Sequence, residues 1–426
     1  MDGLLTPLNT SAVSEILNDS KWVVVDTRPS DAYNGWKLNG VRRGGHLPGA
    51  IDFPANWLDS DKEDTETILS EALQTKGMTP EHRVLLYSTN QSDLQRVAGF
   101  LQKRGFKELH GYNVNQWAMD PEMPLIKYPT FQLIVPAIVV KDLMDGKRPE
   151  TFEDTIRVKF VEASWGDEKA SYRHGHVPGS FHVNTDHFEP PPSWMLGDLG
   201  VLTGFASRYG FQHDDTVIVT SKDPIASFRL AVVLRSIGVR DVRVLNGGLD
   251  AWTSAGFELE RKRHDAPKAT SFGTPILGRS ELICDMKRVK NQLPKSSSFT
   301  AVDTRTWAEF IGEASGYSDH KQKGRIPGSV YGQHEFRGND SMKPYRNIDK
   351  TMRNAGEIQL QWVRSGVDPT KHLSFFCGSG WRAAEVLTYA NVMDFTNCSL
   401  YSDGWIGWSN DPSNPTEVGD PNADGS

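Results

Sequence analysis

The sequence is poor in cysteine, in long apolar runs and in concentrated charge of one sign. Its 3 cysteines in 426 residues are too few and too scattered for a disulfide framework, and no Cys-x-x-Cys pair suggests a zinc site. No apolar run reaches the roughly 18–20 residues of a membrane span, and the first residues lack the layout of a secretory signal. The net charge is -7 without a dense basic block, so neither nucleic acid nor a membrane is an expected partner. These absences predict a soluble, intracellular protein.

An internal repeat organises what is present. At 426 residues one compact core is not expected, because chains beyond roughly 250–300 residues split into domains. A short apolar run followed by a Gly-x-x-Pro-Gly turn occurs three times, in residues 22–28 and 45–50, 160–164 and 175–180, and 300–305 and 324–329. A second apolar run, a polar loop, a helical stretch and another strand-like run follow each copy. The repeat therefore predicts three related domains.

The alternation of strand and helix signals sets the expected fold class. It predicts an α/β protein of three tandem domains, each with a central, mainly parallel sheet flanked by helices. Polar and proline residues collect near residues 121–129 and 261–275, which places the domains at 1–127, 128–268 and 269–426. We expect the proline run at residues 189–193 to be a surface loop and the tail from residue 410 to be loosely held.

The sharpest chemical signal is the segment Cys377-Gly-Ser-Gly-Trp-Arg382. An apolar run ends at Cys377, a glycine-rich turn follows, and a helix is expected to open near Trp381. Gly378 and Gly380 can adopt positive φ values, so successive backbone N–H groups can point at the sulfur. Those donors, the helix N-terminus and the Arg382 charge would stabilise a thiolate. Cys377 is therefore the candidate nucleophile, although most free cysteines are packing residues.

The corresponding loops of the other two repeats have no cysteine. They read Tyr-Ser-Thr-Asn-Gln-Ser-Asp at 87–93 and Thr-Ser-Lys-Asp-Pro-Ile-Ala at 220–226. We expect the first two domains to lack this chemistry and to serve as structure, as a partner surface or as a wall of the site.

The remaining cysteines and a histidine pair have simpler structural interpretations. Cys284 and Cys398 are expected to pack in the core, with a disulfide between Cys398 and Cys377 as a less favoured alternative. His174 and His176 have no matching cysteine or carboxylate cluster in the sequence. We therefore predict a surface turn there and no metal site.

The Asp-Thr-Arg triplet places a carboxylate at a strand end in the first and third repeats. Asp303 and Arg305 form the third-repeat copy, and the second repeat has lost the arginine. We expect an Asp–Arg or Asp–backbone bond that fixes the next turn, which makes both residues structural support rather than chemistry.

These motifs together resemble the rhodanese family of sulfurtransferases. The triplet at 303–305, the turn at 324–328, the cysteine loop and the late Tyr-Ser-Asp-Gly-Trp-Ile-Gly-Trp stretch at 401–408 occur in that family's order. With three copies, the chain is most similar to the bacterial three-domain rhodaneses in which only the last domain keeps the cysteine. That resemblance adds the periplasm to the cytoplasm as a possible compartment.

The resemblance implies persulfide chemistry without a metal or organic cofactor. Cys377 would take sulfur from a small donor, thiosulfate or 3-mercaptopyruvate, and pass it to a thiol, cyanide or a protein acceptor. The implied persulfide and donor-binding loop consists of Cys377, Gly378, Ser379, Gly380, Trp381 and Arg382. Members that use thiosulfate commonly carry cations directly after the cysteine, whereas Cys-Gly-Ser-Gly resembles the mercaptopyruvate branch. Arg325 and Arg353 are additional candidates for holding a donor anion.

Two other functions stay open at this point. A cysteine loop that ends in arginine can also hold an oxyanion, as in cysteine phosphatases and arsenate reductases. Those phosphatases place five residues between cysteine and arginine, while Cys377 and Arg382 enclose four. The second alternative is a non-catalytic scaffold or partner-binding protein, because two of the three repeats have lost the cysteine.

Overall fold

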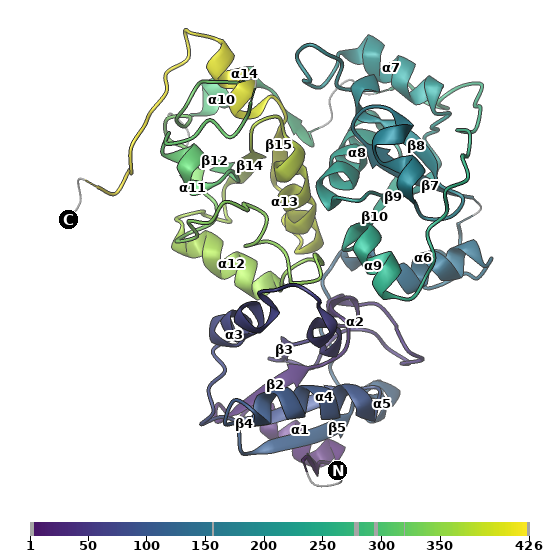
Figure 1. Cartoon of the computed structure of the whole chain (residues 1–426), viewed down its shortest axis with the longest axis vertical. Helices are drawn as coiled ribbons and strands as arrows, with labels where there is room; N and C mark the ends of the chain where they lie inside the picture. The colour runs from purple at the N-terminus through teal and green to yellow at the C-terminus, as the bar shows by residue number, and fades with distance from the viewer. Residues whose placement is uncertain (1–3, 156, 277–280, 294–296, 319, 424–426) are drawn as a thin grey trace. The chain divides into compact units, whose positions relative to one another are not determined.

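The computed structural model describes residues 4–155, 157–276, 281–293, 297–318 and 320–423, and it contains three five-stranded sheets (Figure 1). Their strand orders are β1-β5-β4-β2-β3, β6-β10-β9-β7-β8 and β11-β15-β14-β12-β13, so one topology occurs three times. The strand pairs within the sheets are parallel. The prediction of three α/β domains is confirmed.

The central strands are short apolar runs because both faces of each sheet are covered by helices. The third strand of the second sheet, β9 (Thr216–Thr220), reads Thr-Val-Ile-Val-Thr and is buried throughout. In the third sheet β14 (His372–Phe376) is buried at every position after its first residue. A run of this kind predicts a strand but not its neighbours, which here come from residues far apart in the sequence.

By their contacts the residues form two compact units. One consists of Met1–Gln132 with Asn347–Glu357, and the other of Leu133–Arg346 with Ile358–Ser426. The second and third sheets therefore belong to one unit, while a short segment of the third repeat packs with the first sheet. The domain limits expected from the sequence stay predictions.

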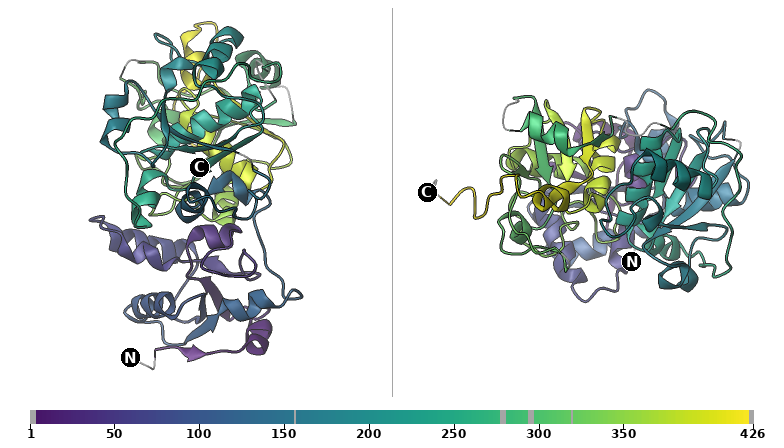
Figure 2. Two further views of the ribbon diagram at one scale, coloured as in Figure 1. Left: turned by 90° about the vertical axis from the view of Figure 1, so that its right-hand side faces the viewer. Right: turned by 90° about the horizontal axis from the view of Figure 1, so that it is seen from above.

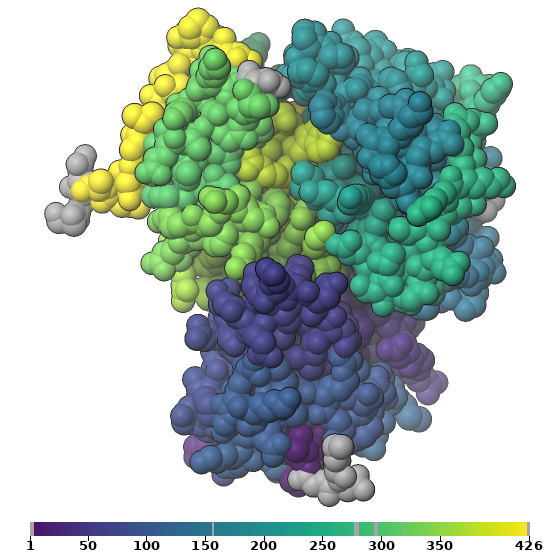
Figure 3. All heavy atoms as spheres, viewed as in Figure 1, coloured from purple at the N-terminus to yellow at the C-terminus, as the bar shows by residue number. Residues whose placement is uncertain are grey.

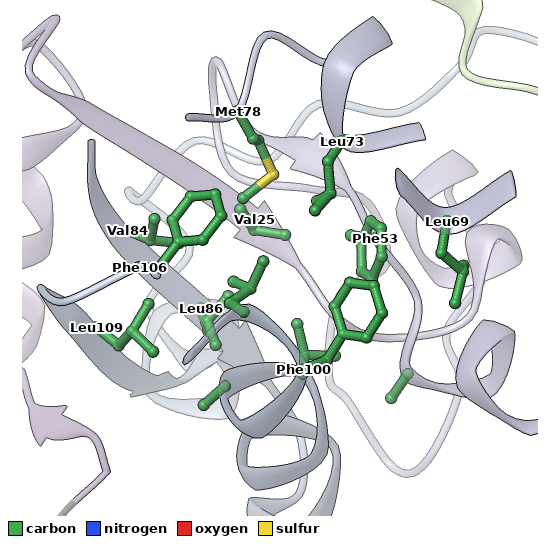
Figure 4. Packing of buried hydrophobic residues seen from close by; sticks show 14 of the residues in the cluster. Val25, Phe53, Leu69, Leu73, Met78, Val84, Leu86, Phe100, Phe106 and Leu109 are labelled. Atoms are coloured by element: carbon green, nitrogen blue, oxygen red, sulfur yellow. The ribbon is translucent and has the colours of Figure 1, made fainter. Parts of the chain in front are cut away.

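The first unit is built around the first sheet. Its strands are β1 (Thr6–Pro7), β2 (Trp22–Asp26), β3 (Ile51–Asp52), β4 (Arg83–Ser88) and β5 (Leu109–Asn113), and its helices are α1 (Thr10–Ile16), α2 (Ser30–Asn34), α3 (Thr65–Thr75), α4 (Gln91–Gln102) and α5 (Val114–Met119). Figure 4 shows its apolar core, in which Val25, Leu86 and Phe100 pack between sheet and helices. The segment Asn347–Glu357 is tied to this unit by Asn354, whose side chain donates to Asp52 at 2.9 Å.

The second repeat has the same layout. Its strands are β6 (Ile134–Val135), β7 (Val158–Ser164), β8 (Phe181–Asn184), β9 and β10 (Asp241–Leu245), and its helices are α6 (Ala137–Met144), α7 (Leu199–Arg208), α8 (Pro224–Ile237) and α9 (Gly248–Ser254). Helix α8 is the element that lies against the third repeat: it packs along α13 (Trp381–Val392), as Figure 1 shows. Its Phe228 ring meets the Tyr389 ring edge-on at 5.3 Å.

The third repeat carries the cysteine loop. Its strands are β11 (Ile283–Cys284), β12 (Phe299–Asp303), β13 (Val330–Tyr331), β14 and β15 (Cys398–Tyr401), and its helices are α10 (Met286–Gln292), α11 (Trp307–Phe310), α12 (Ala355–Arg364), α13 and α14 (Gly404–Asn410). Short 3-10 turns occur in the part of the chain that forms the first two repeats, at η1 (Ala55–Asp59), η2 (Phe131–Leu133), η3 (Glu168–Ala170), η4 (Tyr172–His174) and η5 (Thr185–His187). None of the described helices has the length and hydropathy needed to cross a membrane.

The tail of the chain is held more firmly than the sequence indicated. The backbone of Glu417 forms an antiparallel bridge with Arg325, and Gly419 N–H donates to Ile311 O at 2.8 Å. Trp408 Nε1 also donates to the carbonyl of Pro415 at 2.9 Å. The prediction of a loosely held tail from residue 410 is therefore wrong up to residue 419; beyond it the last described residues are exposed, as Figures 2 and 3 show in yellow.

In each of the three repeats the segment after the last helix pairs with the Gly-x-x-Pro-Gly turn of the same repeat. The residue after the glycine of the Gly-x-x-Pro-Gly turn bridges a residue that follows the last helix of its domain: His46 with Ile126, and His176 with Glu260 in the second repeat. We call these closing segments the straps; they are residues 120–126, 257–264 and 411–419. The sequence showed the turn of each pair but not its partner, because the two are about 80–95 residues apart.

Candidate functional site

Cys377 lies directly after β14, at the carboxyl end of a central strand of the third sheet, and only 2% of it is exposed. Gly380 is the N-cap of α13 with φ 90°, and no side chain caps the helix. The matching helices of the other repeats are capped by Asn90 and Asp223. The first N–H groups of α13 are therefore free of a side-chain acceptor, which is the arrangement that binds anions at helix N-termini.

Contacts on the outer side of the loop fix the direction of its peptide groups. The carbonyl of Cys377 accepts from Trp405 N at 2.8 Å, and the carbonyl of Gly378 accepts from Ile406 N at 3.0 Å. A Cβ on Gly404 would lie 2.5 Å and 2.4 Å from these two oxygens, and its φ is 56°. Only glycine fits there. Because the carbonyls are turned toward α14, the peptide N–H groups of the loop are directed to its inner side.

Arg382 is the loop cation, and a carboxylate already balances its charge. It forms a bidentate pair with Glu309, at 2.9 Å and 2.8 Å, and also donates to Tyr317 Oη at 2.6 Å and Ser341 Oγ at 3.0 Å. Burial alone would raise the pKa of Glu309, but the hydrogen bonds and charge of Arg382 hold it at about 2. The expectation that Arg382 adds net positive charge for a donor therefore has to allow for the Glu309 carboxylate.

Gly378 is a glycine for a different reason than the sequence suggested. Gly380 has a positive φ, as expected, but Gly378 does not. A Cβ on Gly378 would instead lie 1.8 Å from Tyr317 Oη and 2.0 Å from its Cζ. The phenol of Tyr317 thus occupies the space beside the loop, and burial raises its pKa above the ordinary value. Tyr317 ends the stretch 307–317, which resembles the family most specifically, but the sequence assigned it no role, because only the folded chain brings it to the loop.

The second domain contributes a buried ion pair to the loop. Arg229, on α8, donates from Nε to Glu189 Oε1 at 2.8 Å and from Nη2 to Ser402 Oγ at 2.7 Å. The other oxygen of Glu189 accepts from Trp381 Nε1 at 2.8 Å. Arg229 Nη1 has no hydrogen-bond partner among the described residues, and it lies 3.0 Å from the position of a Cβ on Gly380.

This contact corrects the interpretation of the proline run that follows Glu189. The segment 189–193 was expected to be a surface loop, yet Glu189 is only 2% exposed. Pro191 and Pro192 are exposed, so the expectation holds only beyond the first two residues. Burial raises the pKa of Glu189, while the charge of Arg229 acts to lower it. A charge and its counter-charge therefore reach the cysteine loop from a domain that has no cysteine at this position.

The Asp–Arg pairing expected at the strand ends is present. Arg305 donates from Nη2 to Asp303 at 2.7 Å and to the carbonyl of Gly324 at 2.9 Å, and its guanidinium lies 4.8 Å from the Trp405 ring centre. Both charged residues are fully buried. The pair joins the end of β12 to the turn at Gly324, and the aromatic ring of Trp405 is part of the core beneath the loop rather than of an open pocket.

The two additional arginines are engaged elsewhere. Arg325 donates to Gly419 O at 2.5 Å and pairs with Glu417 at 3.2 Å, so it fastens the tail. Arg353 belongs to the segment grouped with the first unit and pairs with Glu357 at 3.5 Å. Their role in donor binding stays a prediction that these contacts do not favour.

The other cysteines are buried, as expected for packing residues. Cys398 Sγ is 2.8 Å from the carbonyl of Phe395 and accepts from Asn391 Nδ2 at 3.2 Å. Burial raises the pKa of the Cys398 thiol to about 12, which disfavours the thiolate needed for a resolving role. Cys284 is also buried, and burial raises its pKa too.

The comparison with family models decides the family. The model of the rhodanese-like domain matches residues 9–115, 149–255 and 285–411. The chain belongs to the rhodanese family. Each match covers four of the five strands of one sheet and begins after β1, β6 or β11, and the cysteine loop lies in the last match.

One relative and several solved structures match almost the whole chain. It is 36% identical over 407 residues to the thiosulfate sulfurtransferase YnjE of Escherichia coli, across 94% of this chain and 90% of that one. It is 26% identical to the 3-mercaptopyruvate sulfurtransferase of the same organism, across 56% of this chain and 81% of that protein.

The anaerobic ergothioneine biosynthesis enzyme of Chlorobium limicola, solved with trimethyl histidine, matches with a TM-score of 0.90 and 31% identity, over 98% of this chain and 100% of that one. A variant of the enzyme EanB, solved as a cysteine persulfide with ergothioneine, also matches with a TM-score of 0.90, at 32% identity over the same shares of the two chains. The chain is accordingly a sulfurtransferase of the rhodanese type.

Proposed function

We propose that Cys377 carries the sulfur as a persulfide. Its thiolate attacks the outer sulfur of the donor, and an S–S bond forms while the donor's S–S or C–S bond breaks. The leaving group is sulfite from thiosulfate, or the enolate of pyruvate, which then takes a proton, from 3-mercaptopyruvate. The acceptor next attacks the outer sulfur and the Cys377 thiolate leaves. The observation that carries this proposal is the loop geometry: inward N–H groups and an uncapped α13 N-terminus at a buried sulfur.

We further propose that the site favours a donor with one negative charge. Arg382 is paired with Glu309, and Arg229 with Glu189, so these two cations bring no net charge to the loop. The main-chain donors can still hold one carboxylate or one persulfide. A dianion such as thiosulfate would need an uncompensated cation, so 3-mercaptopyruvate is the expected donor of the two.

Intact-mass measurement tests both proposals. The protein is incubated with either donor and compared with Cys377→Ser, which keeps the side-chain size but not the nucleophile. We expect a gain of one sulfur atom in the wild type only, formed at a higher kcat/KM with 3-mercaptopyruvate. A sulfur adduct that persists in Cys377→Ser would remove Cys377 from the mechanism. No adduct with either donor, together with an unaltered cellular role of Cys377→Ser, would favour the scaffold.

A second candidate acceptor is an imidazole. The solved EanB structures include the persulfide form and variants of two residues. One of these residues is a tyrosine, and the other is a threonine that follows the persulfide cysteine by two positions. In this chain Ser379 stands two residues after Cys377, and the Tyr317 hydroxyl lies beside Gly378. In such a transfer the outer sulfur of the persulfide forms a C–S bond at the imidazole carbon, the S–S bond breaks, and the ring C–H proton is lost. The sulfur is reduced as the carbon is oxidised, so no external oxidant is needed.

Mass spectrometry of the small molecules distinguishes the two acceptors. Persulfidated protein is mixed with trimethyl histidine or, separately, with a thiol or cyanide, and loss of the protein-bound sulfur is followed. Imidazole transfer predicts a product one sulfur atom heavier than trimethyl histidine, with a much lower rate in Tyr317→Phe. Rapid discharge by the thiol and none by trimethyl histidine would leave the simpler sulfur transfer as the activity.

A further inference from the structure

The second domain brings together two histidines and a glutamate at its strap. The backbones of His176 and Glu260 are fixed by two hydrogen bonds of 3.0 Å and 2.8 Å, which form the antiparallel bridge between the turn and the strap. His264 lies four residues further along the strap, and its Nε2 is 2.8 Å from Glu260 Oε2. One ligand-type atom from each of the three residues lies within 4.8 Å of the other two.

The imidazole of His176 is oriented as a metal ligand is. It stacks on the Tyr172 ring with centroids 3.7 Å apart, and its Nδ1 is 2.9 Å from the carbonyl oxygen of Tyr172. Because a carbonyl only accepts, Nδ1 carries the proton and the lone pair of the neutral ring is on Nε2. A backbone carbonyl that holds the second nitrogen in this way is the usual outer support of a metal-binding histidine.

The free nitrogen of His176 is the independent sign that the cluster accepts a ligand. His176 is fully buried, and its Nε2 has no hydrogen-bond partner among the described residues. A buried lone pair without a partner is unfavourable, and a cation in contact with Glu260 and His264 would satisfy it.

We propose that His176, Glu260 and His264 form a binding site for a divalent transition metal ion of the zinc type. Two imidazole nitrogens and one carboxylate are a ligand set that zinc takes with a water molecule in the fourth position. The side chains of Glu260 and His264 are 26% and 29% exposed, which leaves the ion a path from solvent and room for that water. Bonds of about 2.0–2.2 Å to zinc need the ligand atoms about 3.3 Å apart, so His264 Nε2 and Glu260 Oε2, which are 2.8 Å apart here, would separate by about 0.5 Å to admit the ion.

The other two repeats serve as comparisons within the same chain. His46 of the first repeat has the same ring stacking and the same bond to a carbonyl, at 3.7 Å and 2.8 Å, but the strap residue opposite is Ile126. In the third repeat Arg325 replaces the histidine and pairs with Glu417. Each repeat thus has an equivalent position where the turn meets the strap, and the three candidate ligands occur together at this position in the second repeat.

The sequence predicted no metal here because His176 showed no carboxylate nearby. Glu260 and His264 lie 84 and 88 residues further along the chain, and only the bridge between turn and strap brings them to the histidine. A bound ion would fasten the strap of the second domain, as the Arg325–Glu417 ion pair does in the third. The proposal does not depend on the activity of the Cys377 loop.

Metal analysis of the full chain without a purification tag tests the proposal. The protein, in the Cys377→Ser background so that no reactive thiol competes, is stripped with a chelator, mixed with zinc and passed through a desalting column. We expect one equivalent of zinc in the parent and in the control His174→Ala, whose exposed side chain is outside the cluster. In His264→Ala and Glu260→Gln we expect the bound zinc to fall below a tenth of an equivalent.

Cobalt substitution gives the second readout. Cobalt in the same site should show the visible absorption of a four- or five-coordinate ion without the intense charge-transfer band of a thiolate, and zinc should raise the thermal midpoint of the parent but not of His264→Ala. Because His264 and Glu260 are partly exposed, both variants are expected to fold, which circular dichroism checks. No stoichiometric zinc in the parent, or zinc retained by both variants, would overturn the assignment.

Discussion

Replacing Gly378 by alanine should disable the cysteine loop without changing any group that reacts. The φ of Gly378 is one that alanine can adopt, so the only obstacle is steric. The added Cβ would stand 1.8 Å from Tyr317 Oη, whereas ordinary contacts begin at 3.4 Å, so the phenol or the loop must move by about 1.6 Å. Tyr317 is itself held by its 2.6 Å bond with Arg382, which resists that movement.

The size of the effect follows from this displacement. A misplacement of about 1 Å in a catalytic group can cost about 100-fold, and over-packing typically costs about 1–3 kcal/mol of stability. We therefore expect Gly378→Ala to lower kcat/KM for persulfide formation about 100-fold while the protein stays folded at room temperature. The assay is single-turnover sulfur uptake at Cys377, followed by intact mass.

Two further variants test whether the overlap with Tyr317, and not the replacement of a glycine as such, causes the loss of activity. Gly204, in α7, has nothing within 4 Å of a built Cβ, so Gly204→Ala should leave the sulfur uptake unchanged. The double variant Gly378→Ala, Tyr317→Ala removes the overlapping ring and should be about as active as Tyr317→Ala alone. If the two losses instead multiply, or if Gly378→Ala is within threefold of the wild type, the steric reasoning is refuted.

Two other predictions concern buried charges of the second domain. Arg229→Met leaves Glu189 buried without its partner, so we expect the free energy of unfolding to fall by about 3–5 kcal/mol, seen as a lower calorimetric midpoint. The double variant Arg229→Met, Glu189→Leu should recover part of this loss. A single variant as stable as the wild type would argue against the pair. Burial raises the pKa of Glu162 to about 7, against about 4.5 in the unfolded chain, so the folded state binds the extra proton between these values. Through this shift Glu162 lowers stability by about 3 kcal/mol as the pH rises through that window, while His182, 3.9 Å away and with its pKa lowered by burial to about 4, acts in the opposite sense. Glu162→Gln should therefore make the thermal midpoint rise more steeply with pH between about 4.5 and 7, and an unchanged profile would refute this.

The fold was largely predictable because one pattern occurs three times. Runs such as Thr-Val-Ile-Val-Thr at 216–220 predict buried strands, and the Gly-x-x-Pro-Gly turns mark equivalent positions in each copy. The straps were missed because each joins its turn through one pair of residues, such as Arg325 and Glu417, without a repeated motif of its own. The composition of the segment from residue 410 predicted a loosely held tail, but the bridge between Arg325 and Glu417 holds this segment in place.

The site was predictable only as far as local chemistry reaches. Cys377, Gly380 and Arg382 stand together in the sequence, and their nearness at a strand-to-helix turn could be read directly. The carboxylates near these residues could not be predicted from the sequence, because Glu309 lies 73 residues and Glu189 lies 193 residues away from Arg382. Spacing along the chain says nothing about such pairs until the packing of α8 against α13 is known.

The charges that reach the loop explain why a domain without the cysteine remains part of the enzyme. Arg229 and Glu189 both come from the second domain, and together they contact Trp381 in the cysteine loop and Ser402, which follows β15. Neither contact could be made by the third domain alone. A buried ion pair adds little net stability, but it fixes geometry, because its hydrogen bonds are satisfied in one arrangement only. The second domain therefore acts as a wall that fixes the shape of the cysteine loop and adds no net charge to it, while the proposed chemistry stays with Cys377.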